Sequence, residues 1–257
     1  MKDFRIFRKY RALFLFGLFR NVTGIFMFYY IGKLVGNAGG FAGEKNAYFA
    51  FALTGMAVST LFNGVSSSIM RAFSRERAEG TFEELFVTLP GRPFLLAFSC
   101  GAYNTLSSII SCLFLFVCGA LAGASFHIAS FTAFMVIVAI SGFIFAGFSL
   151  LSAGLFMFTR KSASLTGHIN SLGAILGGAF FPVSIMPEWL QSLSFFIPLR
   201  HIIESFRIIL LEGGDFYDVY PSAVTGAIFA VFFFLTGLYV YKAGIMNSMR
   251  KGGLSFY

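Results

Sequence analysis

Charged residues are scarce in this chain of 257 residues. Lys and Arg number 19 and Asp and Glu number 11, so 12% of the residues carry charge, whereas 57% are hydrophobic. A soluble domain usually carries about twice that fraction of charge. Residues 46–70, 93–159, 162–187 and 219–241 contain no charged residue at all. This scarcity excludes an ordinary soluble domain and indicates a protein that crosses a membrane.

Sequence signatures of catalysis are also missing. No G-x-x-x-x-G-K-[ST] string is present, and GGFAGEKN, which begins at Gly39, has Glu44 between Gly43 and Lys45. The chain therefore has no P-loop to bind a nucleotide. The three His are scattered, and the three Cys all fall in the predicted third span, without metal-ligand spacing. No nucleophile–base pair is visible either, so we expect neither a metal site nor an enzyme. We interpret the Cys residues as free thiols in an apolar helix.

The uncharged stretches predict an all-α membrane protein that forms a single domain over residues 1–257. A helix needs roughly 20 apolar residues to cross a bilayer, so the 67 residues of 93–159 must cross more than once. The string GASFHIAS, from Gly123 to Ser130, is the expected turn between those two crossings. Alternation with a period of two is absent, which argues against a transmembrane β-barrel. The six predicted spans are 12–33, 47–70, 94–122, 130–158, 163–182 and 219–241.

The N-terminal string MKDFRIFRKY predicts an interfacial helix at about residues 2–10, with apolar side chains in lipid and basic ones at the headgroups. Arg20 lies inside the first span. A lone Arg facing lipid at mid-bilayer costs about 2.5 kcal/mol or more, so we expect it to face the bundle or a partner helix. The alternative is that the span starts later and Arg20 extends to the headgroups.

The distribution of Lys and Arg predicts the orientation. With the N-terminus inside, 14 of these residues lie on the cytoplasmic side and four on the opposite side, and Arg20 lies in a span. This bias predicts a multi-pass protein of the inner (plasma) membrane with both termini in the cytoplasm. The net charge of +8 is thus a topology signal, and we expect no nucleic-acid binding because the basic residues do not gather on a soluble domain.

One short stretch, SRERAEGTFEELFVTLPGRP at residues 74–93, concentrates charge between the second and third spans. The second span can continue as a helix to Glu79, where Gly80 is a natural stop. Thr81 and Glu84 then form a capping box for a new helix. Its apolar face would consist of Phe82, Leu85, Phe86 and Leu89. The pattern predicts a short amphipathic helix at the cytoplasmic surface; the alternative is a solvated connector.

This stretch resembles the cytoplasmic loop of type-2 ATP-binding-cassette (ABC) exporter permeases, roughly E-R-x-x-G-T-[LF]-E-x-L-x-x-[ST]-P. A second string, GGAFFPVSIMPEWLQSLSFFIPLRHIIESFR at residues 177–207, resembles the end of the fifth crossing and the outer segment of the same family. One departure is Thr88-Leu89-Pro90, where the family often has Thr-Pro. The resemblance implies a coupling helix that docks on a separate ATPase subunit. The residues implied in that coupling are Arg77, Glu79, Gly80, Thr81, Phe82, Glu83, Glu84, Leu85 and Phe86.

The resemblance also places the second and fifth crossings around a translocation path. The candidate lining residues are Phe51, Thr54, Val58, Phe62, Asn63, Asn170, Leu172, Ile175, Leu176 and Ala179. We expect an apolar outer gate at Phe180, Phe181 and Pro182. Gly173 and Gly177 fit G-x-x-x-G, which predicts close packing either at a dimer seam or within one subunit.

The segment after the gate predicts two short amphipathic helices that dip back into the outer leaflet as a lid. Pro187 and Pro198 suit helix starts, and Trp189 suits a membrane interface. In the second helix Ile202, Ile203, Phe206, Ile209 and Leu210 share one face. Arg200, Glu204 and Arg207 are spaced to pair with one another. The alternative is an interfacial packing element with no gating role.

The resemblance thus implies the permease subunit of an ATP-driven exporter for an amphipathic, drug- or lipid-like substrate, with polysaccharide or glycolipid export as an alternative. It implies a homodimer in contact with lipid, carrying two ATPase subunits that bind ATP and Mg, and no cofactor in this chain. An ion-coupled secondary transporter is a further alternative. Such proteins usually keep ionisable groups inside the membrane, and the six spans contain no Asp or Glu.

Overall fold

The computed structural model describes residues 11–35, 46–81, 93–127, 130–159 and 162–250. Within these ranges the chain is helical and contains no strand. The predicted interfacial helix at 2–10 lies outside them. The elements are α2 (Arg11–Val35), α3 (Ala47–Ser66), α4 (Ser68–Ala78), α6 (Pro93–Leu121), α7 (Phe131–Phe158), α8 (Ser162–Leu176), the 3-10 turn η1 (Val183–Ile185), α9 (Glu188–Phe195), α10 (Pro198–Leu210) and α11 (Phe216–Arg250).

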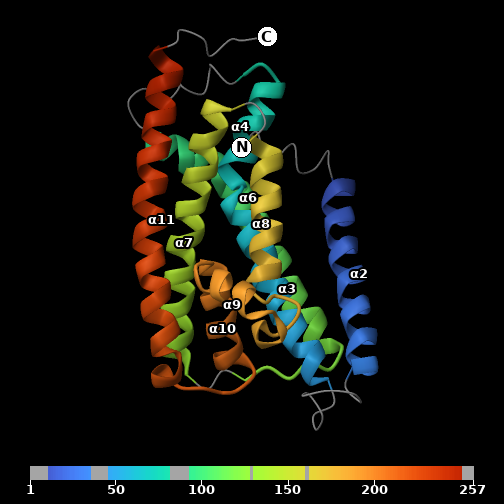
Figure 1. Cartoon of the computed structure of the whole chain (residues 1–257). Helices are drawn as coiled ribbons and strands as arrows, with labels where there is room; N and C mark the ends of the chain where they lie inside the picture. The colour runs from blue at the N-terminus through green and yellow to red at the C-terminus, as the bar shows by residue number, and fades with distance from the viewer. Residues whose placement is uncertain (1–10, 36–45, 82–92, 128–129, 160–161, 251–257) are drawn as a thin grey trace.

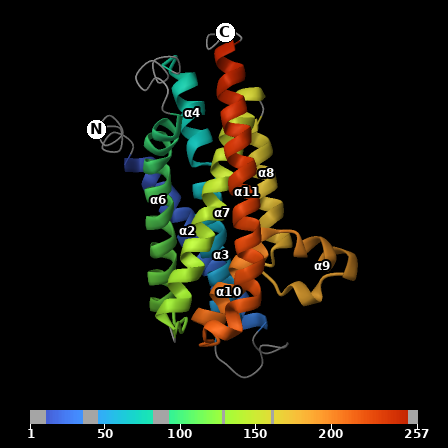
Figure 2. The same cartoon turned by 90° about the vertical axis from the view of Figure 1, so that its left-hand side faces the viewer.

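The long helices run side by side in one bundle (Figures 1 and 2). Helix α4 lies near one end of the bundle, and α10 lies near the other. Helix α8 stops part of the way along, close to α9, and α9 projects outward from the bundle (Figure 2). Helix α2 stands at the side of the bundle away from α11 and packs against α3 and α6.

Four helices of the described part are long and apolar enough to cross a membrane: Ala47–Ser66, Ala97–Leu121, Phe131–Phe158 and Phe216–Ser248. The helices α6 and α7 lie within one residue of the predicted ranges 94–122 and 130–158. Helix α8 has 15 residues, so it rises about 22 Å and is shorter than a hydrocarbon core of about 30 Å. The count of six spans therefore stays a prediction.

Two predicted helix ends differ from the structure. The helix predicted over 47–70 is interrupted at Ser67, where φ is −105° and ψ is 7°, and continues as α4. The helix predicted over 163–182 ends at Leu176, because Gly178 adopts a left-handed φ of 73°. Glycine populates that region without steric cost and commonly ends helices. The predicted end of this helix, at Pro182, was therefore too late in the chain.

The tightest pair of helices, α7 and α11, is joined through glycines spaced seven residues apart. A Cβ atom on Gly147 of α7 would lie 2.7 Å from the backbone of Phe233, and one on Gly237 of α11 would lie 2.3 Å from the carbonyl oxygen of Gly147. Gly154 and Gly244 repeat this contact one heptad later. Small residues of this kind let helix backbones touch in a membrane.

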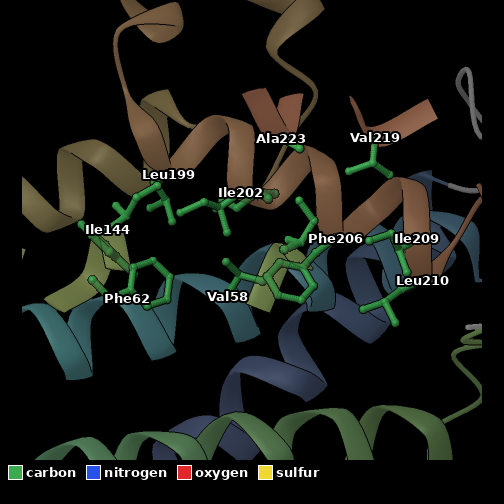
Figure 3. Packing of buried hydrophobic residues seen from close by; sticks show 14 of the residues in the cluster. Val58, Phe62, Ile144, Leu199, Ile202, Phe206, Ile209, Leu210, Val219 and Ala223 are labelled. Carbon is green, nitrogen blue, oxygen red and sulfur yellow. The ribbon is translucent and has the colours of Figure 1, made fainter. Parts of the chain in front are cut away.

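Helix α10 supplies the centre of the main apolar cluster. Its residues Leu199, Ile202, Phe206, Ile209 and Leu210 point toward α3, α7 and α11 (Figure 3). The predicted apolar face of α10 is buried, including Ile203 at 0% exposure, which confirms that prediction. The helix begins at Pro198, as predicted. This packing fixes α10 against the spanning helices.

Candidate functional site

Helix α4, which leads to the predicted coupling loop, sits firmly on the bundle. Its side chains Ile69, Met70 and Phe73 are buried against α6, α7 and α11, and the Phe73 ring stacks on Tyr241 with 6.5 Å between centroids. Arg77 lies over the ring of Phe156 of α7, at 5.7 Å. Any displacement at the end of α4 would therefore reach several helices at once.

The end of α4 agrees with the predicted stop. The helix ends at Ala78, and Gly80 has a left-handed φ of 74°. Glu79 and Gly80 are exposed, and the Thr81 hydroxyl donates to a carboxylate oxygen of Glu76 at 2.5 Å. The remaining residues implied in coupling, Phe82, Glu83, Glu84, Leu85 and Phe86, lie outside the described residues. The capping box and the apolar face stay predictions.

A band of polar side chains surrounds the break between α3 and α4. The Asn170 amide of α8 donates to the Ser66 hydroxyl, and the Asn104 amide of α6 donates to the Ser68 carbonyl, both at 2.9 Å. The hydroxyls of Ser68 and Ser149, on α7, are 2.9 Å apart. The break is thus tied to three neighbouring helices. Sequence reasoning missed this band, although the Ser66-Ser67-Ser68 run was a visible signal.

The predicted path residues do not gather on one open face of a single subunit. Thr54, Val58 and Phe62 of α3 are buried, and the last two pack in the main apolar cluster with Ala179. Leu172 and Ile175 of α8 are instead exposed, at 58% and 44%. The remaining predicted path residues are Phe51, Asn63 and Leu176, which are partly buried, and Asn170, which is buried.

The end of α8 and the segment after it, which contains the predicted gate at Phe180, Phe181 and Pro182, are held by donors from three elements. The Ser194 hydroxyl of α9 donates to the Leu176 carbonyl at 2.6 Å. The Tyr48 hydroxyl of α3 donates to the Phe180 carbonyl at 3.1 Å, and the Phe180 ring stacks on Phe28 of α2 with 5.4 Å between centroids. Phe181 and Pro182 are partly buried.

The third donor is Arg207 of α10. Its Nη2 atom donates to the carbonyl oxygens of Ala179, at 2.9 Å, and of Phe51, at 3.2 Å. The guanidinium lies 3.4 Å from the centroid of the Phe51 ring. The expected ion pair between Arg200 and Glu204 is present at 4.0 Å. The expected pair between Glu204 and Arg207 is a longer-range attraction and not a direct contact: Glu204 is exposed, whereas Arg207 points toward the carbonyls of Phe51 and Ala179.

In the part of the chain that the structure describes, no three His, Cys, Asp or Glu side chains are close enough to hold a metal ion. The chemistry that these residues offer is therefore hydrogen bonding and apolar contact. The polar side chains form two groups along α8: the band near α4 meets the middle of the helix at Asn170, and the three donors lie at its C-terminal end and on the segment that follows.

Comparison with known proteins assigns the chain to a family of transporters. A family described as ABC-2 type transporter matches residues 2–211. The chain is 27% identical over 227 residues to Nodulation protein J of Sinorhizobium fredii (strain NBRC 101917 / NGR234), which covers 84% of this chain and 81% of that protein. It is 28% identical over 172 residues to the putative transport permease ycf38 of Cyanophora paradoxa, with 64% of this chain and 57% of that protein covered.

Proposed function

The chain belongs to the ABC-2 type transporter family, and on that premise we propose that it is the membrane-spanning permease subunit of an ATP-driven exporter. The observation that carries this proposal is the seating of α4. Ile69, Met70 and Phe73 lock α4 onto α6, α7 and α11, and the loop that resembles a coupling helix follows directly after Gly80. A push on that loop would be transmitted to the spanning helices.

Energy would come from a separate ABC ATPase subunit that binds ATP and Mg, and this permease subunit would catalyse no reaction itself. The sequence supports that division because it contains no P-loop. Docking would place Phe82 and Phe86 in the ATPase surface, with the Glu residues of the loop around them. Buried aromatic anchors usually carry more of the binding energy than exposed ion pairs, which are worth about 0–1 kcal/mol.

We propose that two copies of the chain form a homodimer and that the translocation path lies between them. Helix α8 supports this because Ile169, Leu172 and Ile175 are exposed and a Cβ atom on Gly173 would meet nothing within 4 Å. Contiguous exposed apolar side chains of this kind mark lipid or protein contacts. In this arrangement Leu172 and Ile175 line the path directly. The buried members of the predicted set support the wall behind them.

The cargo that fits this path is amphipathic, drug- or lipid-like. The exposed face of α8 combines apolar Ile169, Leu172 and Ile175 with polar His168 and Ser171. The ring of Phe180 stands at the proposed gate. We place the α4 end of the bundle in the cytoplasm and the α10 end on the opposite side of the inner membrane. The excess of Lys and Arg on the N-terminal tail, on α4 and on the C-terminal end supports this orientation. Transport would run outward from the cytoplasm.

Isolation of the complex from its own host membranes tests the proposal. A tagged copy, cross-linked before extraction, should co-purify an ABC ATPase that mass spectrometry identifies, and a differently tagged second copy of this chain. The reconstituted complex should hydrolyse ATP and export a fluorescent amphipathic dye from vesicles. Recovery of the chain without any ATPase, under conditions in which the two tagged copies do co-purify, would refute an ATP-driven permease.

A further inference from the structure

The C-terminal end of α8 is bound by donors from other elements. The last four carbonyl groups of any α-helix have no partner within the helix. Where water is absent each such group must find another donor. Backbone amides of Gly177, Gly178 and Ala179 turn back to Gly173, Ile175 and Ala174 and satisfy three of them. The fourth, on Leu176, accepts from a side chain. Beyond the helix, the carbonyls of Ala179 and Phe180 also accept from side chains.

Arg207 is the donor that reaches two elements. Its Nη2 atom lies 2.9 Å from the Ala179 oxygen, in the gate segment, and 3.2 Å from the Phe51 oxygen, on α3. The same guanidinium covers the Phe51 ring. Because α10 is anchored in the main apolar cluster by Phe206 and Ile209, the Arg207 side chain extends from a fixed support.

The two elements that Arg207 bridges touch through their backbones. A Cβ atom on Gly55 of α3 would lie only 1.9 Å from the Ala179 carbonyl oxygen. This oxygen therefore sits against α3 and accepts from Arg207 at the same time. The gate segment can leave α3 only if the Arg207 contact breaks or moves with it.

The partners of Arg207 suit a contact that opens and closes. They are neutral carbonyl groups and an aromatic face, and the Nε atom of Arg207 is buried without a hydrogen-bond partner. The described ion pair of α10 joins Arg200 to Glu204 instead. Glu204, the acidic residue that attracts Arg207, lies on α10 as well. Release of the segment after α8 would therefore separate no pair of opposite charges, whereas loss of one partner of a buried ion pair is strongly unfavourable.

We propose that Arg207 is the positioning residue of the gate: it holds Ala179 to Pro182 against α3 while the path is closed, and the contact is released when the path opens. This inference rests on the proposed function, because it takes the segment after α8 to be a gate.

A thiol-labelling experiment tests the assignment directly. Phe181→Cys is introduced after Cys100, Cys112 and Cys118 have been replaced by Ala, and the protein is purified in lipid nanodiscs, where both faces are open to a hydrophilic maleimide. With Arg207 present, labelling should be slow. Arg207→Met should raise the labelling rate by about tenfold, because a minor open state becomes a major one. Arg207→Lys keeps the charge but loses the planar guanidinium, so its labelling rate should lie between those of the parent protein and Arg207→Met.

Arg200→Met is the matched control. Arg200 lies on the same helix and carries the same charge, but it contacts the Gln191 carbonyl and Glu204 and not α3 or the gate. Its labelling rate should equal that of the parent protein. If Arg207→Met fails to insert, Phe51→Leu takes its place in the test. Phe51→Leu removes the aromatic face under the guanidinium and leaves both carbonyl acceptors. It should raise the labelling rate of Phe181→Cys about threefold. Equal rates in the parent and in whichever variant inserts would overturn the proposal.

A second measurement separates this proposal from the exporter function. In the complex with the co-purified ATPase, trapping with ATP and vanadate should raise labelling of the parent protein but add little in Arg207→Met, which is already open. A residue that only stabilised the fold would not remove the response to nucleotide. If trapping changes nothing in the parent protein, ATP coupling fails; if it raises labelling equally in Arg207→Met and the parent, the Arg207 assignment fails.

Discussion

Asn170 of α8 donates a hydrogen bond to the hydroxyl of Ser66, the last residue of α3, with 2.9 Å between Nδ2 and Oγ. Both side chains are buried, at 2% and 0% exposure. Ser66 directly precedes the break that leads into α4, and α8 leads to the gate. This one bond thus connects the helix next to the coupling loop with the helix next to the gate.

A double-mutant cycle should detect this bond as an energetic coupling. Asn170→Ala and Ser66→Ala should each lower the free energy of unfolding, because each leaves a buried polar group without its partner. The coupling energy between them should be about 0.5–1.5 kcal/mol, the range for hydrogen bonds between membrane helices. Reversible unfolding in mixed micelles measures it, with the exposed neighbour Ser171→Ala as control. Additive effects of the two changes would contradict a direct bond.

The glycine contact between α7 and α11 should tolerate no added methyl group. In Gly237→Ala the new Cβ would approach the Gly147 carbonyl oxygen to 2.3 Å, and a backbone atom cannot move aside cheaply. We expect a loss of about 1–3 kcal/mol in the free energy of unfolding. Gly142→Ala, on α7, is the control because its Cβ would meet nothing within 4 Å. That variant should be neutral or up to about 1 kcal/mol more stable. Thermal unfolding in detergent compares them.

The left-handed backbone at Gly80 should matter more than the absence of a side chain there. A Cβ atom there would meet nothing within 4 Å, but φ is 74°, which proline cannot adopt and which asparagine tolerates better than most residues. We expect Gly80→Pro to reduce ATPase stimulation by cargo strongly and Gly80→Asn to retain most of it. Both variants should reach the membrane in equal amounts. Equal stimulation by both would show that the turn after α4 has no part in coupling.

Phe86→Asp should abolish association with the ATPase while the protein still inserts, because it places a charge in the apolar face that we predict to dock. Glu83→Ala should be mild, since one exposed ion pair contributes about 0–1 kcal/mol. Glu79→Ala should be intermediate, because Glu79 is exposed beside the Gly80 turn. The amount of ATPase that co-purifies with each variant measures the strength of association. Normal assembly and export by Phe86→Asp would reduce the loop to a connector.

The topology prediction can be checked with two single cysteines. Ser74 lies on α4, and Asp215 is exposed just before α11, at the other end of the bundle. In a background without native Cys, an impermeant maleimide should label Asp215→Cys from outside intact cells and Ser74→Cys only after permeabilisation. Labelling of both from one side would overturn the orientation.

Much of the helix layout could be read from the sequence, because it depends on local chemistry. The uncharged runs located α6 and α7, Pro198 marked the start of α10, and the apolar spacing along α10 identified its buried face. The spacing of Gly147 from Gly154 and of Gly237 from Gly244 was also a usable signal for helix contact that our sequence reasoning did not use. These features are fixed by turn geometry and by the absence of water in a bilayer.

The contacts between helices were decided only by the tertiary structure. Spacing along α10 suggested Glu204 as the partner of Arg207, yet Arg207 lies on the carbonyls of Phe51 and Ala179. Asn170, a predicted path residue, is buried and donates to Ser66, a contact that its own sequence did not indicate. Both outcomes depend on how each helix is rotated about its own axis. That rotation is set by packing against residues far away in the chain. When a helix is apolar on most sides, its own sequence does not show which side faces a neighbour.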